Sequence, residues 1–298
     1  MHTVDILLPT YNGEAYIEEQ INSLLNQTYT NIKIIIRDDG STDKTNEIIQ
    51  EVAKKDSRVI INIGIKKNLG LVGNINYLLG ISNSNYIMFC DQDDVWFVNK
   101  VEVLLNELQR MESELNKNTP ILSHSDCFVT DEYLNGRDLF KGSKPLQYGL
   151  RNSLFKFYVQ GASVIFNLSL KNEIYPFISN VYLHDRYTHL VVEIVGSRSY
   201  INAPLMYYRQ HSKNLVGSSS LFNKIKNTLI LKNFNYFQNK DRNLIKSLYD
   251  EKYPDNKFLG NYLRITSRDL SVFEKLRLLK KYKISMRFKE FIIMILKC

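Results

Sequence analysis

The sequence predicts an α/β fold: a mixed, mostly parallel sheet flanked by helices, followed by a helical C-terminal extension. Three observations support this prediction. Short apolar runs alternate with helix-like patterns up to about residue 115, acidic turns follow two of those runs, and basic residues gather after residue 220. Strands that alternate with helices along a chain usually form a parallel sheet that the helices cover.

The first half of the chain has the clearest alternation. Each predicted strand is a short apolar run, and each predicted helix has apolar residues at three- and four-residue spacing. The predicted strands are Val4–Leu8, which ends at Pro9, Lys33–Arg37, Arg58–Ile63 and Tyr86–Cys90. The predicted helices are Glu14–Leu25, about Lys44–Lys54, one opened by Asn68-Leu69-Gly70, and about Asn99–Leu115.

From Pro120 onward the alternation is weaker. The predicted elements are strands at Ile121–Ser125 and Ile201–Arg209, a helix at Asp185–Val195 and a loop at Thr130–Gly149. Residues 221–298 have the pattern of helices. We therefore predict one domain over residues 1–220, with halves at 1–115 and 116–220, and a helical basic region over 221–298.

Composition limits the class of protein. The chain has 298 residues, of which 44% are hydrophobic, enough for a large core and too many for a disordered chain. Its three cysteines, Cys90, Cys127 and Cys298, do not match a disulfide framework or a zinc site. A reducing compartment fits this pattern, and no signal peptide is visible, so we expect a cytoplasmic protein.

Charge is divided unevenly along the chain. The net charge at pH 7 is +8, but residues 221–298 carry 18 Lys and Arg against 7 Asp and Glu, whereas residues 1–220 are weakly acidic. A basic tail on an acidic body indicates an anionic partner for the tail. Nucleic acid is a poor candidate, because the acidic body would repel the same polyanion.

The most informative motif is Asp91-Gln92-Asp93-Asp94, directly after the predicted strand Tyr86–Cys90. Three carboxylates this close raise one another's pKa, and a bound cation is the usual relief. A second acidic turn, Asp38-Asp39-Gly40-Ser41, follows another predicted strand. Because ligands of open α/β sheets bind beyond the carboxyl ends of strands, the two turns predict a site for a metal ion and a nucleotide. The alternative is a pair of solvated turns that cap helices.

Three further segments are less specific. Asn68-Leu69-Gly70 is either a loose match to a glycine-rich phosphate loop or an ordinary helix start. Asp185, after His184, is either a helix cap or a general base that takes a hydroxyl proton. Arg209 and His211 offer a cation and an imidazole to a diphosphate, although such a pair on a surface loop usually has no function.

In this order along the chain, the motifs resemble those of a family 2 glycosyltransferase with a GT-A fold, a Rossmann-like fold for nucleotide-diphospho-sugars. The resemblance covers about residues 3–220 and includes Leu8-Pro9-Thr10-Tyr11-Asn12 and Leu25-Asn26-Gln27-Thr28-Tyr29. It implies a catalytic domain at 1–220, with a nucleotide-binding half at 1–115 and an acceptor half at 116–220. The basic region 221–298 lies outside it.

The resemblance also implies roles for the matching residues. Asp185 stands at the position of the catalytic base, and Asp93 and His211 at those of metal ligands, with Mg²⁺ or Mn²⁺ as the cofactor. Arg209 and His211 are expected to hold the diphosphate. The residues expected to line the nucleotide pocket are Pro9, Thr10, Tyr11, Asp38, Asp39, Asn68, Gly70 and Asp91.

Two departures from the family pattern are His184 before the base and Gln92 inside the acidic motif. Both resemble a bacterial branch assigned to rhamnosyl transfer in capsule or O-antigen synthesis. The implied reaction is an inverting, metal-dependent transfer of a sugar from dTDP-rhamnose or a UDP-hexose to a glycan acceptor, which is expected to be lipid-linked. The donor sugar, the linkage and the oligomeric state stay open.

Two other functions stay open as alternatives. A sugar-nucleotide nucleotidyltransferase normally has a cationic, glycine-rich loop after its first strand, where this chain has Pro9-Thr10-Tyr11-Asn12-Gly13. A non-catalytic sugar-binding module is disfavoured because Asp93 and Asp185 are both present.

The end of the basic region has an amphipathic pattern. Between Lys275 and Lys297, eight Lys and Arg residues alternate with large apolar residues and a single acid, Glu290. This pattern indicates either a helix that packs on the body or an interfacial helix on anionic lipid. We expect the second, and with it peripheral attachment to the inner face of the cell membrane.

Overall fold

The computed structural model describes residues 2–211 and 239–281, apart from residues 63, 65, 66, 117, 142–145, 147, 156, 158 and 268. The chain forms two compact units. The first comprises Met1–Leu146, Tyr158–Pro176 and Leu183–Ser218, and the second comprises Gln147–Phe157, Phe177–Tyr182 and Ser219–Cys298. The predicted domain boundary at residue 220 falls outside the described residues and stays a prediction.

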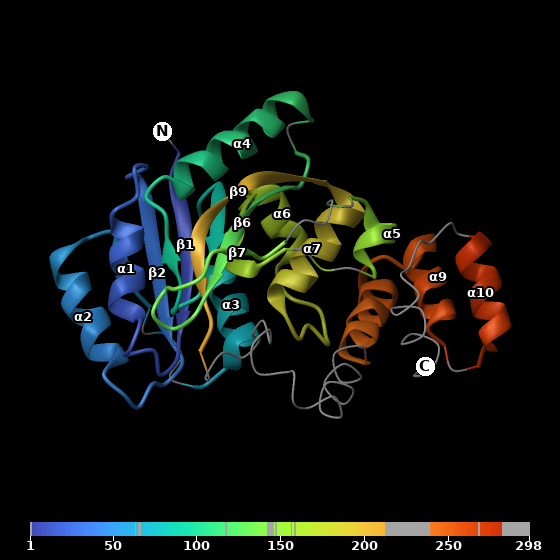
Figure 1. Ribbon diagram of the computed structural model, residues 1–298, viewed down its shortest axis with the longest axis horizontal. Coiled ribbons are helices and arrows are strands. Elements are labelled where there is room, and N and C mark those ends of the chain that lie inside the picture. The colour runs from blue at the N-terminus through green and yellow to red at the C-terminus, as the bar shows by residue number, and fades with distance from the viewer. Residues whose placement is uncertain are drawn as a thin grey trace. The chain divides into compact units, whose positions relative to one another are not determined.

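The first unit is built on one mixed sheet with the strand order β3-β2-β1-β4-β8-β6-β9-β5, and β7 pairs with β6 (Figure 1). The strands are β1 (Val4–Thr10), β2 (Ile32–Asp38), β3 (Val59–Ile61), β4 (Tyr86–Phe89), β5 (Val95–Trp96), β6 (Ile121–Thr130), β7 (Asp138–Leu139), β8 (Val164–Asn167) and β9 (Ser197–Arg209). The helices are α1 (Ile17–Leu25), α2 (Thr45–Lys55), α3 (Gly70–Ile81), α4 (Lys100–Glu114), the short 3-10 helix η1 (Gly161–Ser163), α6 (Leu168–Ile174) and α7 (His184–Val195). The predicted α/β fold is confirmed.

The first four strands of the sheet follow the prediction closely, with one correction. β1 does not end at Pro9 but continues to Thr10, paired with β2. In a parallel strand, the backbone N–H and C=O groups of every second residue point to the same neighbouring strand. Those of Leu7 point toward β4, because the Leu7 carbonyl accepts from the backbone N–H of Cys90. Pro9 is two residues after Leu7, so the N–H that it lacks would also point toward β4. Pairing with β4 ends at Leu7, so no hydrogen bond of the sheet is lost and proline is tolerated.

The second half of the sheet was predicted less completely. β8 runs antiparallel between β4 and β6, and β9 lies parallel to β6. β6 and β9 are both longer than the predicted strands, and the short elements β5, β7, β8, η1 and α6 were not predicted. In β6 the apolar run stops at Leu122, but the strand continues through buried polar residues such as His124 and Asp126. Because these residues are polar, apolar runs in the sequence do not predict the full length of this strand.

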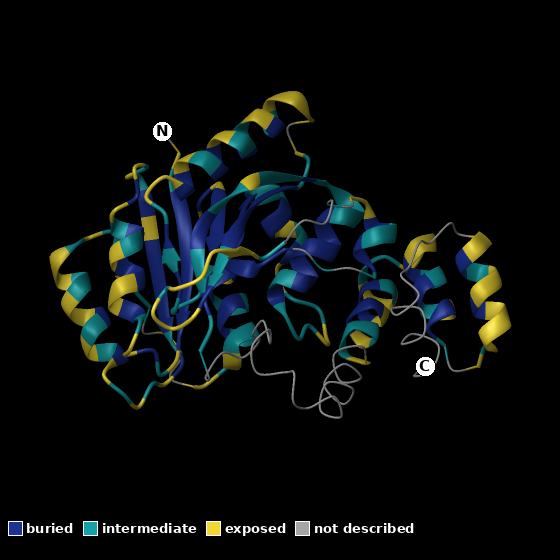
Figure 2. Ribbon diagram, in the orientation of Figure 1, coloured by how far each residue is buried: buried dark blue, intermediate teal, exposed yellow. Residues whose placement is uncertain are grey.

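Helices cover both faces of this sheet (Figure 1). α3 packs on β1 and β2, whereas α4 packs on β6, β8 and β9. The strands are buried, and the outward faces of the helices are exposed (Figure 2). Burial of such apolar strands supplies the main stabilising free energy, about 25 cal/mol for each Å² removed from water.

The arrangement of β1, β2 and β4 decides where a site can form. These three strands are parallel neighbours, so their carboxyl ends lie at one edge of the sheet. The turns after them begin at Tyr11, Asp39 and Cys90. This edge therefore carries both acidic turns of the sequence.

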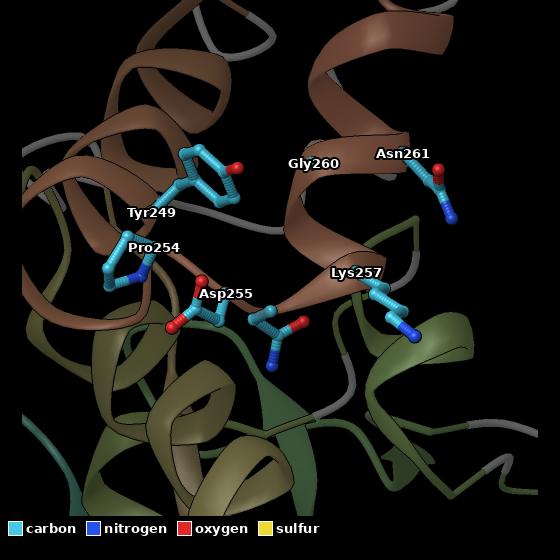
Figure 3. Close-up of a pocket in the computed structure, with 7 residues that line it drawn as sticks. Tyr249, Pro254, Asp255, Lys257, Gly260 and Asn261 are labelled. Carbon is cyan, nitrogen blue, oxygen red and sulfur yellow. The ribbon is translucent and has the colours of Figure 1, made fainter.

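The second unit is helical where it is described, as predicted for the C-terminal extension. It contains α5 (Leu150–Ser153), a helical segment over 239–247 that continues into the π-helix η2 (Leu248–Lys252), α9 (Lys257–Ile265) and α10 (Val272–Lys281). Tyr249, Asp255, Lys257 and Asn261 surround an open polar hollow between η2 and α9 (Figure 3). Within the described ranges, every helix falls short of the length and apolar character needed to cross a membrane.

Our first prediction concerns Asp5, which ties β1 to the turn between α3 and β4. Its buried carboxylate accepts from the Ser82 and Ser84 hydroxyls at 2.8 and 2.6 Å and from the backbone N–H of Asn83 and Ser84 at 3.2 Å. Asp5→Ala leaves these buried donors without acceptors, so we expect a loss of about 2–4 kcal/mol in the free energy of unfolding. Urea denaturation measures it.

The control for this variant is Glu51→Ala, which removes an exposed carboxylate paired with Lys54 on α2. Its denaturation midpoint should match that of the wild type, because exposed ion pairs contribute little. Equal midpoints for Asp5→Ala and Glu51→Ala would contradict the prediction.

Candidate active site

The turns after β1 and β2 are held together by side-chain hydrogen bonds. The Thr10 hydroxyl donates to Asp38 Oδ1 at 3.0 Å, and the Asn12 backbone N–H donates to the Ser41 hydroxyl at 2.8 Å. Burial alone would raise the pKa of Asp38, but hydrogen bonds from Ser41, Asn46 and Thr10 outweigh it and hold the pKa below the usual value. Asp38 is therefore an ionised residue that shapes the turn.

Asp39 is buried and holds the loop before α3. Its carboxylate accepts from the Arg37 guanidinium at 2.7 Å, from the Leu69 backbone N–H at 2.8 Å and from the Gly70 backbone N–H at 2.7 Å. Gly70 has a φ of 68°, a left-handed conformation that favours glycine. Because the Leu69 and Gly70 amides donate to Asp39, these contacts favour the ordinary helix start over a phosphate cradle, and the part of this loop in nucleotide binding stays a prediction.

Gln92, the residue that departs from the family pattern, connects the first turn to the acidic motif. Its side chain accepts from the Tyr11 backbone N–H at 2.9 Å and donates to the Tyr11 carbonyl at 3.0 Å. Gly13 makes room for this link, since a Cβ there would collide with Gln92 Oε1. The turns after β1 and β4 are thus joined directly.

The carboxylates of the acidic motif have different surroundings. Asp94 is fully buried; its Oδ1 accepts from the Arg209 backbone N–H at 3.2 Å, and its Oδ2 has no hydrogen-bond partner among the described residues. Burial, and then the charges of Asp93 and Asp91, raise the pKa of Asp94 well above its usual value. Burial, with Asp93 and Asp185 nearby, raises the pKa of Asp91 to about 7.

Arg209, at the end of β9, surrounds this motif with donors. Its Nε donates to the Asp93 carbonyl at 2.8 Å, one terminal nitrogen donates to the Glu132 carbonyl at 2.5 Å, and the other pairs with the Glu19 carboxylate. The guanidinium also lies over the Tyr16 ring, 4.8 Å from its centroid. Arg209 therefore has a structural role in the site. Its contact with a diphosphate stays a prediction.

His211 contacts the acidic motif through its imidazole. Its Nε2 lies 2.9 Å from Asp93 Oδ2, and its ring stacks on Tyr16 with centroids 4.7 Å apart. The structure therefore brings together Asp93 and His211, the two residues predicted as metal ligands, although they are 118 residues apart in the chain.

Asp185 lies in the first turn of α7 and faces the same region. Burial raises its pKa to about 6, against the opposing effect of the backbone N–H of Arg186, which donates to it at 2.7 Å. Adjacent residues connect it to the acidic motif, since Gly161 lies against Asp185 and Gln160 donates to Asp91. The charge of Asp185 also contributes to the raised pKa of Asp91. A carboxylate titrating near neutral pH is suited to accept a proton.

His184 and Gly161 lie against this carboxylate. A Cβ on Gly161 would lie 2.9 Å from His184 Nε2 and 3.3 Å from the Asp185 Cβ, so only glycine leaves room there. The buried His184 ring packs edge-on against Phe89, and neither of its nitrogens has a hydrogen-bond partner in the described part of the chain. Burial lowers the pKa of His184 to about 4, so the ring is neutral.

Asp93 and His211 can supply two of the ligands that a divalent ion needs. A carboxylate oxygen and an imidazole nitrogen 2.9 Å apart can turn to one ion, and both residues are half-buried. Across the described ranges, no group of three or more His, Cys, Asp or Glu side chains could hold a metal by itself. Mg²⁺ is usually bound by one or two carboxylates together with phosphates of the substrate, so two protein ligands fit a metal that arrives with a diphosphate.

Sequence reasoning missed two residues that support the site. Gln160 donates to Asp91 Oδ2 at 3.1 Å, and Lys100 donates to the Ala162 carbonyl at 2.5 Å. Both side chains are buried. The only sequence signal is a polar residue inside an apolar pattern, which usually indicates an exposed face instead.

Comparison with known proteins agrees with this geometry. The family described as Glycosyl transferase family 2 matches residues 5–135. The dTDP-rhamnosyl transferase RfbG of Shigella flexneri is 28% identical over 294 residues, covering 93% of this chain and 96% of that protein. The UDP-Glc:alpha-D-GlcNAc-diphosphoundecaprenol beta-1,3-glucosyltransferase WfaP of Escherichia coli is 33% identical, covering 60% of this chain and 66% of that protein.

Solved structures with similar folds include glycosyltransferases. Residues 1–349 of Staphylococcus aureus TarS in complex with UDP-GlcNAc align with a TM-score of 0.59 at 16% identity, covering 98% of this chain and 78% of that one. The mannosyltransferase PcManGT from Pyrobaculum calidifontis, in complex with GDP-Man and Mn²⁺, aligns with a TM-score of 0.55 at 13% identity, covering 96% and 76%. At these identities the likeness concerns the fold, which is GT-A.

The matched family, its similar relatives and the GT-A fold agree with one another and with the acidic turns at the strand ends. They favour glycosyl transfer over the two alternatives, nucleotidyl transfer and sugar binding without catalysis. Residues 5–135 of this chain are a glycosyltransferase family 2 domain, and the chain is a glycosyltransferase.

Proposed function

We propose that this enzyme is an inverting, metal-dependent glycosyltransferase of bacterial surface polysaccharide synthesis. The donor is a UDP- or dTDP-linked sugar, and the acceptor is a glycan carried on a lipid. The observation that supports the proposal most is the meeting of the Asp93–His211 pair with Asp91 and Asp185 at one edge of the sheet. The names of the rhamnosyl and glucosyl transferases that it resembles support this donor and acceptor.

In this proposal the nucleotide lies over the turns after β1 and β2. Thr10, Tyr11 and Asp39 line the pocket for the base and ribose, with Asp38 as the residue that shapes the turn. Tyr11 is half exposed, so its ring is available to a base. The other residues proposed for the nucleotide are Pro9, Asn68, Gly70 and Asp91.

Asp93 and His211 would hold Mg²⁺ or Mn²⁺ together with the diphosphate of the donor. A bound divalent ion would offset the negative charge that develops on the diphosphate as the sugar leaves. Arg209 contributes by holding the Asp93 backbone in place through its carbonyl. The Tyr16 ring keeps the His211 imidazole oriented by stacking.

Asp185 would act on the acceptor. Its carboxylate takes the proton of the acceptor hydroxyl while that oxygen attacks the anomeric carbon from the face opposite the diphosphate. One displacement of this kind inverts the anomeric carbon and needs no covalent intermediate on the enzyme. His184, neutral and next to Asp185, does not compete for the proton, because its pKa of about 4 is below that of Asp185.

The second prediction tests the metal ligands. Asp93→Ala should abolish Mn²⁺-dependent binding of UDP by calorimetry and lower turnover about a hundredfold or more, because the metal supplies several kcal/mol of stabilisation. EDTA should inactivate the wild type, and Mn²⁺ should restore it. The control is Asp56→Ala, which removes a partly exposed carboxylate paired with Arg58. Full turnover of Asp93→Ala in EDTA would refute metal dependence.

The third prediction uses the raised pKa of Asp185. A base works only as the carboxylate, and a pKa of about 6 means that this form is lost as the pH falls through 6 instead of through 4. Turnover should therefore fall about tenfold for each pH unit below 6. Asp185→Asn should lower turnover about 10²- to 10⁴-fold and keep UDP affinity, because it removes the proton acceptor but little volume. Wild-type turnover in Asp185→Asn would show that another residue is the base.

The fourth prediction concerns membrane attachment by the second unit. On α10 the apolar residues Val272, Phe273 and Leu276 are 50%, 79% and 43% exposed, beside the basic Arg277 and Lys280. Residues 282–298, which carry the rest of the predicted amphipathic pattern, lie outside the described residues. Exposed apolar side chains next to cations are typical of an interfacial helix on anionic lipid.

A double variant, Phe273→Ser with Leu276→Ser, should reduce co-sedimentation with phosphatidylglycerol vesicles about tenfold at low salt, because it removes apolar area that would enter the interface. Tyr133→Ser is the matched control, since Tyr133 is 76% exposed in the first unit. If the wild type ignores these vesicles at low salt, or if the double variant binds them as well as the wild type does, α10 is not the membrane contact.

A further inference from the structure

Lys100, the first residue of α4, is a buried basic residue of the first unit. Its side chain is completely inaccessible to solvent, which is rare for lysine because a buried ammonium is costly unless its protons find acceptors. Its Nζ lies 2.5 Å from the Ala162 carbonyl, 3.1 Å from Met206 Sδ and 3.5 Å from the centroid of the Trp96 ring.

Each of these three partners belongs to a segment that carries part of the site. Trp96 is in β5, two residues after the acidic motif, and Met206 is in β9, which ends at Arg209. Ala162 is in η1, directly after Gln160, which donates to Asp91, and Gly161, which lies against Asp185. One side-chain nitrogen therefore contacts three segments: the strand after the acidic motif, the strand that leads to His211, and the turn beside Asp185.

The electrostatic surroundings are consistent with this placement. Burial lowers the pKa of Lys100 to about 7, while the charges of Asp94 and Asp91, with Cys90 and Cys127, act in the opposite direction. The ammonium in turn lowers the pKa of Asp94 and of Asp91, against the larger effect of burial.

We propose that Lys100 is a positioning residue of this enzyme: by binding the Ala162 carbonyl it holds the 160–162 turn so that Gln160 stays on Asp91 and Gly161 stays beside Asp185. This inference rests on the roles proposed above for Asp91 and Asp185. Lys100 does not touch substrate and acts through Gln160 and Gly161. The two carboxylates keep their relative position only while the turn between them is fixed.

The test is a double-mutant cycle between Lys100→Met and Gln160→Leu, read as kcat/KM with the nucleotide sugar that gives turnover. Each single variant should lose about tenfold, and the double variant should be no worse than the poorer single one, because both break the same connection. Lys54→Met on α2 is the matched control, since its ammonium is 68% exposed, and it should turn over like the wild type.

Stability separates positioning from a merely structural role. Lys100→Met leaves the buried Ala162 carbonyl without its donor, so its thermal midpoint should fall. A positioning role predicts that kcat/KM stays about tenfold low at a temperature well below that midpoint, where the variant is folded, whereas a merely structural role predicts wild-type kcat/KM there. Losses that multiply in the double variant, or wild-type turnover in Lys100→Met, would overturn the proposal. If Lys100→Met does not fold, Lys100→Gln, whose polar side chain is too short to reach the Ala162 carbonyl as Nζ does, takes its place in the same cycle.

The outcome for Asp185→Asn distinguishes two kinds of failure. If that variant turns over like the wild type, the proposed function fails, whatever the cycle gives. If it is inactive and the losses of Lys100→Met and Gln160→Leu multiply, the proposed function stands and only the role of Lys100 is wrong.

Discussion

The crowding of carboxylates at one edge of the sheet is the constraint on which the rest of this structure depends. Asp91, Asp93 and Asp94 follow one strand, and Asp185 approaches them closely enough to raise the pKa of Asp91. Like charges in a half-buried site oppose folding unless donors, cations or protons relieve them. The surrounding chain must therefore supply that relief while it leaves some carboxylate oxygens available to a ligand.

The relief comes from segments far away in the sequence. Arg209 and His211 reach the acidic motif from the end of β9, and Gln160 reaches it from the residue before η1. β9 is long because it must run beside β6 and then pair with β5, which directly follows the acidic motif. The irregular second half of the sheet thus completes a site that the regular first half begins.

The first half of the fold could be predicted from the sequence because its strands are apolar runs and its helices have regular spacing. The acidic turns could be predicted for a different reason, since adjacent carboxylates repel one another and a strand end that collects them indicates a bound cation. Apart from His211, which the family resemblance placed with Asp93, the partners of those acids could not be predicted. Gln160, Lys100 and the structural contacts of Arg209 depend on which segments meet in space, and a lone Gln or Lys carries no signal of that. β6 was cut short in the prediction because its buried residues are polar.

The family match covers only one half of the candidate site. Residues 5–135 contain the acidic turns, with Asp38, Asp39, Asp91 and Asp93, which face the donor in the proposed function. Asp185, Arg209 and His211 lie beyond that range, on α7 and at or just after the end of β9. The residues proposed to face the donor therefore lie within the matched range, whereas the residue proposed as the base for the acceptor lies outside it. Two hydrogen bonds join these halves, since Gln160 donates to Asp91 and Lys100 donates to the Ala162 carbonyl. If Asp185 is the base, the second half of the site depends on these contacts for its position relative to Asp91.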